Sequence, residues 1–364
     1  MNTPIRIVPG TPAIVLAPMD GLTDAPMRAV QGEIGAFTFA VSEFVRVSAT
    51  VVPKSVFYRQ VPELHHGAMT PHGLPVQVQL LGGDAERMAQ SALVACAAGA
   101  TAIDINFGCP APTVNTHDGG ATLLKHPTRI REIVAAVRGA VPPAIPVSAK
   151  LRLGWDSTDA IFENAAMAAA GGADWLTIHG RTRAQGYKPP VLWENIAKVR
   201  EQLSIPVVAN GDIWTLAGFR RCRAETGCTH FMLGRGALAD PFLTHAVAAE
   251  LDIHPTNPSL SPTDDDTARL DWRPYLRRIM ALTPLNADVP PAKASFYLAC
   301  RLKQWLKIAN MCGNCSAFDA VKRAQSVEEL FTLLTCFYDT TCAPSRNFPS
   351  GNSVRSENFR QAIR

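Results

Sequence analysis

The chain has 364 residues, of which 47% are hydrophobic and 18% are charged, enough to bury one large domain or a large and a small one. Its formal net charge of +4 permits a polyanionic partner without requiring one. Nine irregularly spaced cysteines, no secretory start and no apolar run of about 18 residues argue against a disulfide framework, secretion and a membrane span. We therefore expect a cytoplasmic protein with reduced thiols.

Short apolar runs alternate with Ala-rich or amphipathic segments such as 84–100 and 161–173. Eight of these runs have the length and composition of buried strands. They are 13–17, 37–42, 76–81, 102–106, 147–153, 175–179, 207–210 and 230–234. Eight strand–helix units predict a (β/α)8 TIM barrel within residues 1–250. A doubly wound open sheet is the alternative, but eight units would make it unusually wide.

The composition changes after the last predicted strand. Residues 252–272 are rich in Pro, Ser and Asp, which is typical of a linker. Beyond them, residues 295–310 and 327–339 have helical periodicity. The pattern predicts a small α-helical domain over 264–342 and a disordered basic tail over 343–364.

Polar side chains occur at the late positions of five predicted strands. These residues are Gln79, Asn106, Lys150, His179 and Asn210. Each alone has a structural explanation as a turn, a cap or a satisfied core group. Because the carboxyl ends of barrel strands form the active-site mouth, the five together predict a pocket for a large polar heterocycle.

The loops after the last two predicted strands carry the sequences NGDI and LGRGAL. In such barrels these loops often bind phosphate through backbone N–H groups and a helix N-terminus. Gly211, Gly234 and Gly236 would allow close approach, and Arg235 would pair with the phosphate. A phosphate-bearing heterocycle at a barrel mouth indicates flavin mononucleotide (FMN), unless these glycines serve only as turn residues.

Several motifs in order along residues 13–243 resemble those of the tRNA-dihydrouridine synthases. They are LAPMDGLTDAPMR, SEFVR, VQLLG, DINFGCPAPTVN, GGATLLKHP, AKLRLGWD, IHGRTRAQGY, VVANGDI and LGRGAL. EFVRV (43–47) and RLKQWL (301–306) resemble the bacterial C subfamily. The resemblance implies an FMN-binding barrel with a C-terminal tRNA-binding helical domain, and NADPH as hydride donor. The substrate would be the uridine at position 16 of the tRNA D-loop.

The resemblance also implies roles for individual residues, carried over by motif. Those expected to bind FMN are Pro18, Met19, Asp20, Gln79, Lys150, His179, Asn210, Gly211, Asp212, Gly234 and Arg235. Those expected to touch the target nucleotide are Asn106 and Tyr187. Those expected to orient tRNA are Arg46, Arg301, Lys303 and Lys322.

Cys109 lies in a Gly-Cys-Pro segment directly after the fourth predicted strand. Reduction of uridine to dihydrouridine places a hydride, from reduced FMN, on C6 and a proton on C5. A thiol with a pKa near ~8.5 is mostly protonated at neutral pH and can act as the acid. We therefore predict that Cys109, in a loop stiffened by Pro110 and Pro112, protonates C5. The alternative for a free cysteine is a small buried hydrophobic residue.

Two other functions remain open from the sequence. One is an FMN barrel oxidoreductase acting on a small molecule, and the other is a non-catalytic RNA-binding protein. Cys312 and Cys315 form a CxxC, but the downstream pair Cys336 and Cys342 has poor spacing for zinc, so we expect no metal and no redox disulfide. No obligate protein partner is implied.

Overall fold

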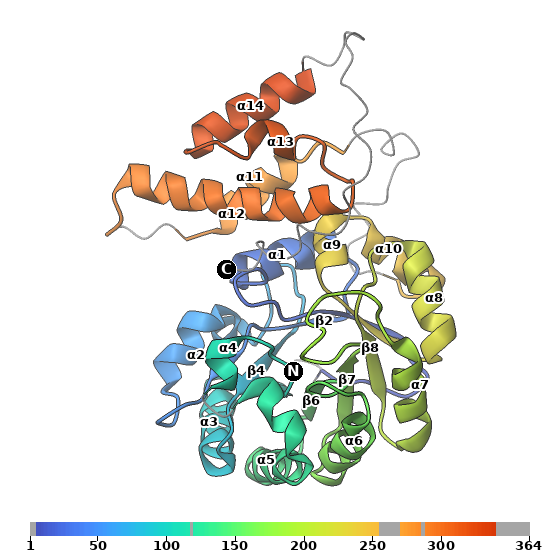
Figure 1. The fold of residues 1–364 in the computed structure, drawn as a ribbon. Helices are drawn as coiled ribbons and strands as arrows, with labels where there is room; N and C mark the ends of the chain where they lie inside the picture. Colours follow the sequence, from blue (N-terminus) through green and yellow to red (C-terminus); the bar gives the residue numbers. More distant parts are fainter. Residues whose placement is uncertain (1–4, 117–118, 255–269, 285–287, 340–364) are drawn as a thin grey trace.

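The structure is a computed structural model that describes residues 5–116, 119–254, 270–284 and 288–339. A closed barrel occupies the N-terminal part of the chain, and a layer of helices lies on one end of it (Figure 1). The predicted tail 343–364 lies outside the described residues, as do Cys342 and most of the predicted linker.

The barrel strands are all parallel, which is the arrangement that the alternating strand–helix pattern predicts. They are β1 (Ala13–Leu16), β2 (Phe39–Val41), β4 (Val76–Leu81), β5 (Ile103–Asn106), β6 (Val147–Arg152), β7 (Trp175–His179), β8 (Val207–Asn210) and β9 (His230–Leu233). Their order is β2-β1-β9-β8-β7-β6-β5-β4, and β2 pairs with β4 to close the ring. The eight predicted strands and the barrel are thus confirmed. A two-residue strand that was not predicted, β3 (Val45–Arg46), pairs with the end of β4.

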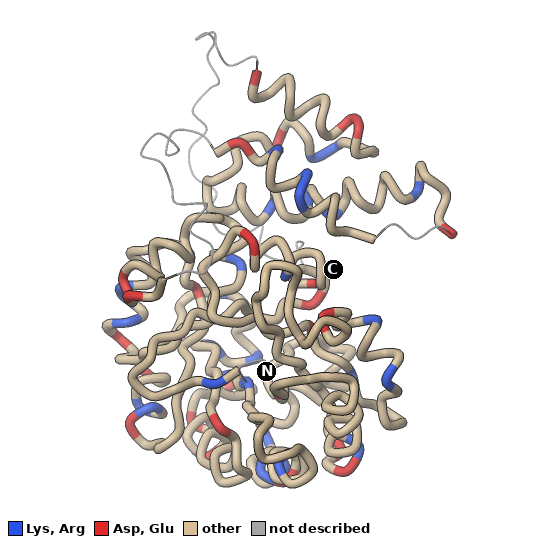
Figure 2. The backbone as a smooth tube through the Cα atoms, turned by 180° about the vertical axis from the view of Figure 1, so that it is seen from behind, with Lys and Arg blue, Asp and Glu red and all other residues tan. Residues whose placement is uncertain are grey.

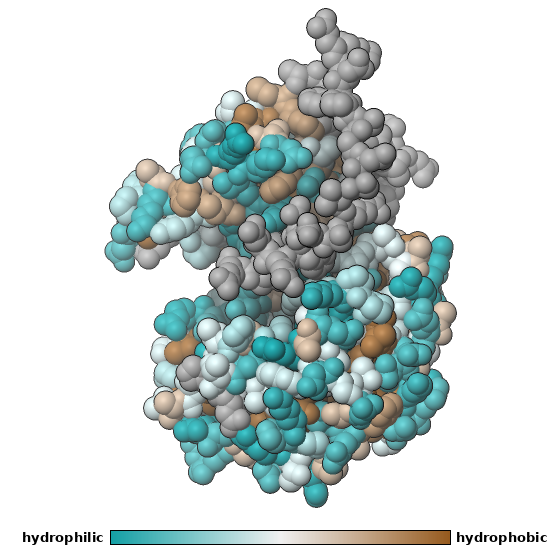
Figure 3. Space-filling view, viewed as in Figure 1, coloured by the Kyte–Doolittle hydropathy of each residue, from teal (hydrophilic) through white to brown (hydrophobic). Residues whose placement is uncertain are grey.

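Helices surround the barrel and cover the outward faces of its strands (Figure 1). They are α1 (Ala25–Ile34), α2 (Lys54–Gln60), α3 (Ala85–Ala97), α4 (Pro112–Asn115), α5 (Pro127–Ala140), α6 (Ala160–Ala170), α7 (Trp193–Gln202), α8 (Leu216–Thr226), α9 (Arg235–Ala239) and α10 (Leu243–Glu250), with 3-10 turns η1 (Pro62–His66) and η2 (Gly120–Lys125). Their apolar faces and the strands form the main core. Hydrophilic residues cover much of the barrel surface in Figure 3.

The inside of the barrel holds both apolar and polar side chains. A separate cluster that includes Phe39, Trp175, Val208 and Met232 fills the apolar part. Because side chains alternate along a strand, the inward register of β7 continues from Trp175 through Thr177 to His179 at the carboxyl end. This apolar cluster shares the interior with hydrogen-bonded polar side chains such as Gln77, Asp104 and Ser148, and further polar groups gather at the carboxyl ends of the strands.

The helical domain comprises α11 (Arg273–Leu282), α12 (Pro291–Met311), α13 (Phe318–Val321) and α14 (Val327–Asp339). It shares a hydrophobic core with the barrel, in which Met27 and Val30 of α1 and Leu238 near α9 pack with Trp305 and Leu276. The Trp305 indole also donates a hydrogen bond to the Leu238 carbonyl at 2.7 Å. The two parts therefore pack together through buried side chains.

Helix α11 begins at Arg273, directly after the predicted linker 252–272. Trp272, the last residue of that linker, is fully buried in the helical core, and its indole donates to the Asn314 carbonyl at 2.9 Å. Pro274 follows in the first turn of α11, where a proline is well tolerated. Composition alone does not indicate that the side chain of Trp272, the last residue before α11, belongs to the helical core.

Candidate active site

The five predicted strand-end side chains meet at the barrel mouth. Adjacent parallel strands bring Asn106 opposite Lys150, and His179 opposite Asn210, in the sheet register. Asn106 Nδ2 donates to Gln79 Oε1 at 2.9 Å, and Lys150 Nζ donates to Asn210 Oδ1 at 3.1 Å. The structure thus confirms that these residues are close together; their roles remain predictions.

Cys109 is held by its backbone over this mouth. The Asn106 side-chain oxygen accepts hydrogen bonds from the N–H groups of Gly108 and Cys109, both at 2.9 Å. Arg152 Nε donates to the Gly108 carbonyl at 2.9 Å, and Ala121 N donates to the Cys109 carbonyl at 3.1 Å. Burial raises the pKa of the half-buried Cys109 thiol. The thiol is therefore protonated at neutral pH, as an acid must be.

Two basic side chains at the mouth have depressed pKa values. Burial, followed by the charge of Arg152, lowers the pKa of Lys150 to about 8. Burial and the same arginine hold the pKa of His179 well below its usual value, so the imidazole is neutral. Its Nδ1 is buried without a hydrogen-bond partner among the described residues, which leaves one polar atom to be satisfied by a ligand.

Two arginines that were not predicted as site residues, Arg152 and Arg181, border the same mouth beside the predicted Arg235. Arg152 and Arg181 are buried, and Arg181 pairs through two nitrogens with Asp212. The Arg235 guanidinium lies 4.4 Å from the ring centroid of Tyr187 and 4.8 Å from that of Trp214. Arg152 has the inward register of Lys150 two residues earlier, which could have identified it.

The two predicted phosphate loops lie beside these arginines. Gly211 has φ +124°, a conformation that favours glycine, and a Cβ on Gly236 would lie 2.0 Å from the Ile213 carbonyl oxygen. The Asp212 carboxylate lies 3.7 Å from the Arg235 guanidinium and also accepts from Arg181. Its side chain therefore binds the two arginines and offers no hydrogen-bond donor to a phosphate. A Cβ on Gly234 would lie 3.1 Å from Met19 Sδ, which places the residues after β1 next to this loop.

The predicted tRNA-orienting residues do not form one cluster of unpaired cations. Arg301 donates to the Gly21 and Leu22 carbonyls and to Asp24, all in the loop after β1. Lys303 donates to the Ala324 carbonyl, and Lys322 pairs with Asp319 three residues earlier. Arg46, on β3, donates to the Thr113 carbonyl at 3.1 Å. Basic residues occur on the helical domain near the barrel as well as on the outer barrel helices (Figure 2).

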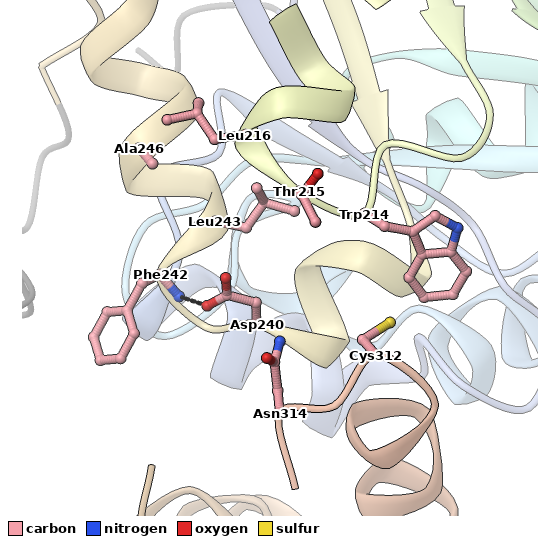
Figure 4. A pocket seen from close by; sticks show the side chains of 9 residues that line it. All are labelled: Trp214, Thr215, Leu216, Asp240, Phe242, Leu243, Ala246, Cys312 and Asn314. Carbon is pink, nitrogen blue, oxygen red and sulfur yellow. Dashed lines mark hydrogen bonds between the residues drawn. The ribbon is translucent and has the colours of Figure 1, made fainter. Parts of the chain in front are cut away.

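A separate cleft of about 210 Å³ lies where α8, α10 and residues 312–314 meet (Figure 4). Its polar side chains are already bonded: Asp240 accepts from Phe242 N at 2.9 Å, and Asn314 donates to the Ala239 carbonyl at 3.1 Å. Cys312 lines it, and burial raises the pKa of this thiol to about 11. The cleft therefore offers few free polar groups to a ligand.

Within the described ranges, no three His, Cys, Asp or Glu side chains gather in an arrangement that could hold a metal ion. The part of the chain that the structure describes also has no helix with the length and apolarity to cross a membrane.

A closed parallel barrel with convergent polar groups at the carboxyl ends of its strands defines a (β/α)8-barrel enzyme. The sequence profile of the family described as Dihydrouridine synthase (Dus) matches residues 15–265. The chain belongs to the dihydrouridine synthase family.

Three relatives named tRNA-dihydrouridine(16) synthase are similar over most of their length. The relative from Pseudomonas syringae pv. tomato is 38% identical over 89% of this chain and 98% of its own. The Pseudomonas putida relative is 43% identical over 80% and 86%, and that from Neisseria meningitidis serogroup B is 41% identical over 89% and 94%.

Two solved structures share the barrel at low sequence identity. Histamine dehydrogenase from Rhizobium sp. 4-9 has a TM-score of 0.51 and 16% identity over 68% of this chain and 47% of that chain. A 2-naphthoyl-CoA reductase has a TM-score of 0.51 and 13% identity over 65% and 50%. The chain spans about half of each, and these likenesses support the fold alone.

Proposed function

We propose that this protein reduces the C5–C6 double bond of a D-loop uridine in tRNA, at position 16, to 5,6-dihydrouridine. The observation that carries the proposal is the Cys109 backbone fixed by Asn106 at the mouth of a dihydrouridine synthase barrel. The match to relatives named for position 16 covers nearly their whole length, which supports the same target position for this chain.

The residues at the mouth fit FMN as the bound cofactor. Four cationic side chains, Lys150, Arg152, Arg181 and Arg235, lie with three acidic side chains, Asp20, Asp104 and Asp212, in the contacts described, so a net positive charge remains for an anionic group. The unpartnered Nδ1 of His179 offers a hydrogen bond to a polar heterocycle. Gln79, Lys150 and His179 would hold the ring and ribityl portions. Asn210, Gly211, Gly234 and Arg235 would hold the phosphate end.

When bound, reduced FMN supplies the hydride that reaches C6 of the uracil, with NADPH as the source of its electrons. The Cys109 thiol gives a proton to C5 and regains one from solvent, so that each turnover consumes one NADPH and one proton. Its raised pKa keeps the proton on sulfur until the carbon becomes basic. The Lys150 ammonium stabilises negative charge that develops during the reaction.

The helical domain contacts the loop after β1 through Arg301 and carries further basic residues, which supports tRNA binding. A base folded in the D-loop must be splayed out to reach the mouth, where Tyr187 and Asn106 would contact it. Exposed Lys322 and Arg46 would bind phosphates, and affinity should fall with salt. In this proposal residues 1–250 carry the catalytic function, the helical domain over 264–342 adds tRNA contacts, and the protein acts in the cytoplasm.

Dihydrouridine-free tRNA incubated with NADPH and the protein, then mapped by nucleoside and fragment mass analysis, tests the proposal. Dihydrouridine at position 16 supports it in full. Dihydrouridine at another position would keep the reaction and overturn the site. A yellow, folded protein that forms none would point to a small-molecule flavin enzyme, and a colourless one to a non-catalytic RNA-binding protein.

A further inference from the structure

One buried carboxyl group at the mouth has no part in the chemistry proposed above. Asp104, on β5, is 2% exposed and bonded through both side-chain oxygens. Gln79 Nε2 donates to Oδ2 at 2.7 Å, and Ser148 Oγ donates to Oδ1 at 2.5 Å. The carboxyl thus lies one hydrogen bond from Gln79 and two from Asn106.

These contacts form a directed chain from the barrel interior to the catalytic loop. Asp104 accepts from Gln79, Gln79 Oε1 accepts from Asn106 Nδ2, and Asn106 Oδ1 accepts from Gly108 and Cys109 N–H. The Asp104, Gln79 and Asn106 side chains are all buried, so water does not readily replace these bonds. The Cys109 backbone is therefore tied to a carboxyl group in the barrel interior.

The direction of the chain is fixed independently from each end. Backbone N–H groups can only donate, so the Asn106 oxygen must face Gly108 and Cys109. Its amide nitrogen must then face the Gln79 oxygen, and the Gln79 nitrogen must face an acceptor. A carboxylate, which only accepts, meets that need at the other end. An amide at position 104 could present either its oxygen or its nitrogen to Gln79, so the orientation would be imposed only from the Gly108 and Cys109 end.

We propose that Asp104 is a positioning residue that fixes the orientations of the Gln79 and Asn106 amides and thereby holds the Cys109 loop in its reactive position. The proposal rests on the proposed function only for the reaction that the loop serves. The contacts themselves predict how firmly Cys109 is held, whatever the substrate is.

Two isosteric substitutions can disrupt the hydrogen bond between residues 79 and 104 when made singly and restore it, with donor and acceptor exchanged, when combined. In Asp104→Asn, the new amide can turn its nitrogen toward that of Gln79, and in Gln79→Glu two carboxylates face each other. In the double variant, the amide introduced at position 104 donates to the carboxylate introduced at position 79, which still accepts from Asn106. Ser148 can still donate to the remaining oxygen at position 104. The double variant therefore restores a complete set of bonds without restoring either original residue.

The test measures the alkylation rate of Cys109 by iodoacetamide, resolved from the other cysteines by peptide mass spectrometry, in the protein as purified. Each single variant should raise this rate about tenfold, the effect of losing one well-formed hydrogen bond, and the double variant should return within about twofold of wild type. The rate of dihydrouridine formation should change in the opposite direction, falling in each single variant and recovering in the double variant.

Asp174→Asn is the matched control, because Asp174 is also a carboxylate that accepts from a backbone N–H, that of Val147 at 2.7 Å, at the opposite end of β6. It should leave Cys109 alkylation unchanged. Unchanged alkylation in both single variants, or no recovery in the double variant, overturns the proposal. If Asp104→Asn does not fold, the comparison of Gln79→Glu with the double variant still decides. The remaining outcome is an alkylation rate that returns to the wild-type value in the double variant while neither wild type nor any variant forms dihydrouridine. That result would reject the proposed function and keep the positioning role of Asp104.

Discussion

The barrel mouth and the helical domain were both predicted to bind parts of one substrate, yet their polar residues are arranged differently. At the mouth, Asn106, Lys150 and His179 come from separate strands and lie together, buried, with unusual pKa values for the two bases. On the helical domain, Arg301 and Lys303 donate to backbone carbonyls of the protein itself. Buried polar groups are costly unless they are partnered, so a ligand that reaches the unpartnered Nδ1 of His179 at the mouth would be stabilising.

The difference shows that one residue type serves two purposes. A cation at the mouth, such as Arg235, has aromatic faces beside it and a carboxylate oxygen of Asp212 3.7 Å away. A cation such as Arg301 has a close carboxylate and two carbonyls in the loop after β1. The first arrangement leaves a charge available to an anion, and the second uses the charge to join two parts of the chain.

The largest effect on activity is expected from removing the Cys109 thiol at the barrel mouth. Cys109→Ala should lower the rate of dihydrouridine formation by about 10²–10⁴, the usual contribution of a positioned acid. The bound flavin and its reduction by NADPH should change little, because the thiol acts only on the nucleotide. Stopped-flow absorbance of the flavin separates the two steps. Cys300→Ala, at an exposed cysteine on α12, is the control; an equal loss there would contradict a specific role for Cys109.

The buried Lys150 side chain should affect the pH dependence of both stability and activity. Because its pKa is lowered to about 8, the folded protein loses this proton below the ordinary lysine value. The unfolded chain therefore binds more protons between pH 8 and about 10.4, and stability rises with pH in that window. Activity should move in the opposite direction, falling as pH rises through about 8 if the ammonium is required.

Lys150→Met tests this pair of trends. The variant should melt at a higher temperature than wild type at pH 7, lose the rise of stability between pH 8 and 10, and form dihydrouridine at least tenfold more slowly. Thermal melts and initial rates across pH are the measurements. A variant that is less stable than wild type at pH 7 would show that burying the Lys150 charge does not cost stability. A variant as active as wild type would show that the charge has no part in the reaction.

His179→Ala should weaken flavin binding rather than the fold. The imidazole is neutral and its Nδ1 has no partner among the described side chains and backbone groups, so the protein alone loses no hydrogen bond at that atom. We expect flavin affinity to fall by about tenfold, the value of one hydrogen bond in a buried site. Fluorescence titration of flavin into the stripped protein measures it. His179→Asn, which keeps a polar group near the same place, should lose less; equal losses would deny that this atom binds the cofactor.

The mouth was predictable from the sequence because strand periodicity fixes which side chains face inward. Gln79, Asn106 and His179 were identified from register and position alone. Asp104, by contrast, has the same parity but reads as one more polar residue, because its importance lies in a hydrogen-bond direction that only the assembled strands reveal. Arg181 was missed for a related reason, since its partner Asp212 lies on another loop.

The helical domain was less predictable because its residues' surroundings depend on how two parts of the chain pack. The amphipathic pattern of α12 predicted the helix correctly. The same pattern could not say that Trp305 would reach the Leu238 carbonyl, or that Arg301 would reach the loop after β1. Packing between distant segments sets these contacts, and no local spacing encodes them.

Arg301 and its exposed neighbour Lys307 provide a direct comparison on one helix. Arg301→Ala removes charge-assisted bonds at a side chain that is 16% exposed, and should lower the free energy of unfolding by about 2 kcal/mol. Lys307→Ala should change it by less than about 0.5 kcal/mol. Chemical denaturation measures both. If Arg301→Ala unfolds like wild type but loses tRNA affinity, Arg301 binds the nucleic acid and not the barrel loop.

The smallest effect is expected at Lys322, whose side chain is 47% exposed and paired with Asp319 three residues earlier. Such a pair contributes little to stability, so Lys322→Ala should leave the melting temperature unchanged. If the lysine contacts a phosphate, its loss should reduce the slope of log affinity against log salt by about 0.7–0.9, whatever the sequence of the tRNA. Asp319→Ala frees the same lysine and should raise tRNA affinity slightly. A salt slope that is unchanged in both variants would remove Lys322 from the tRNA-binding surface and leave the barrel side of the mouth, around Arg46, as the main phosphate contact.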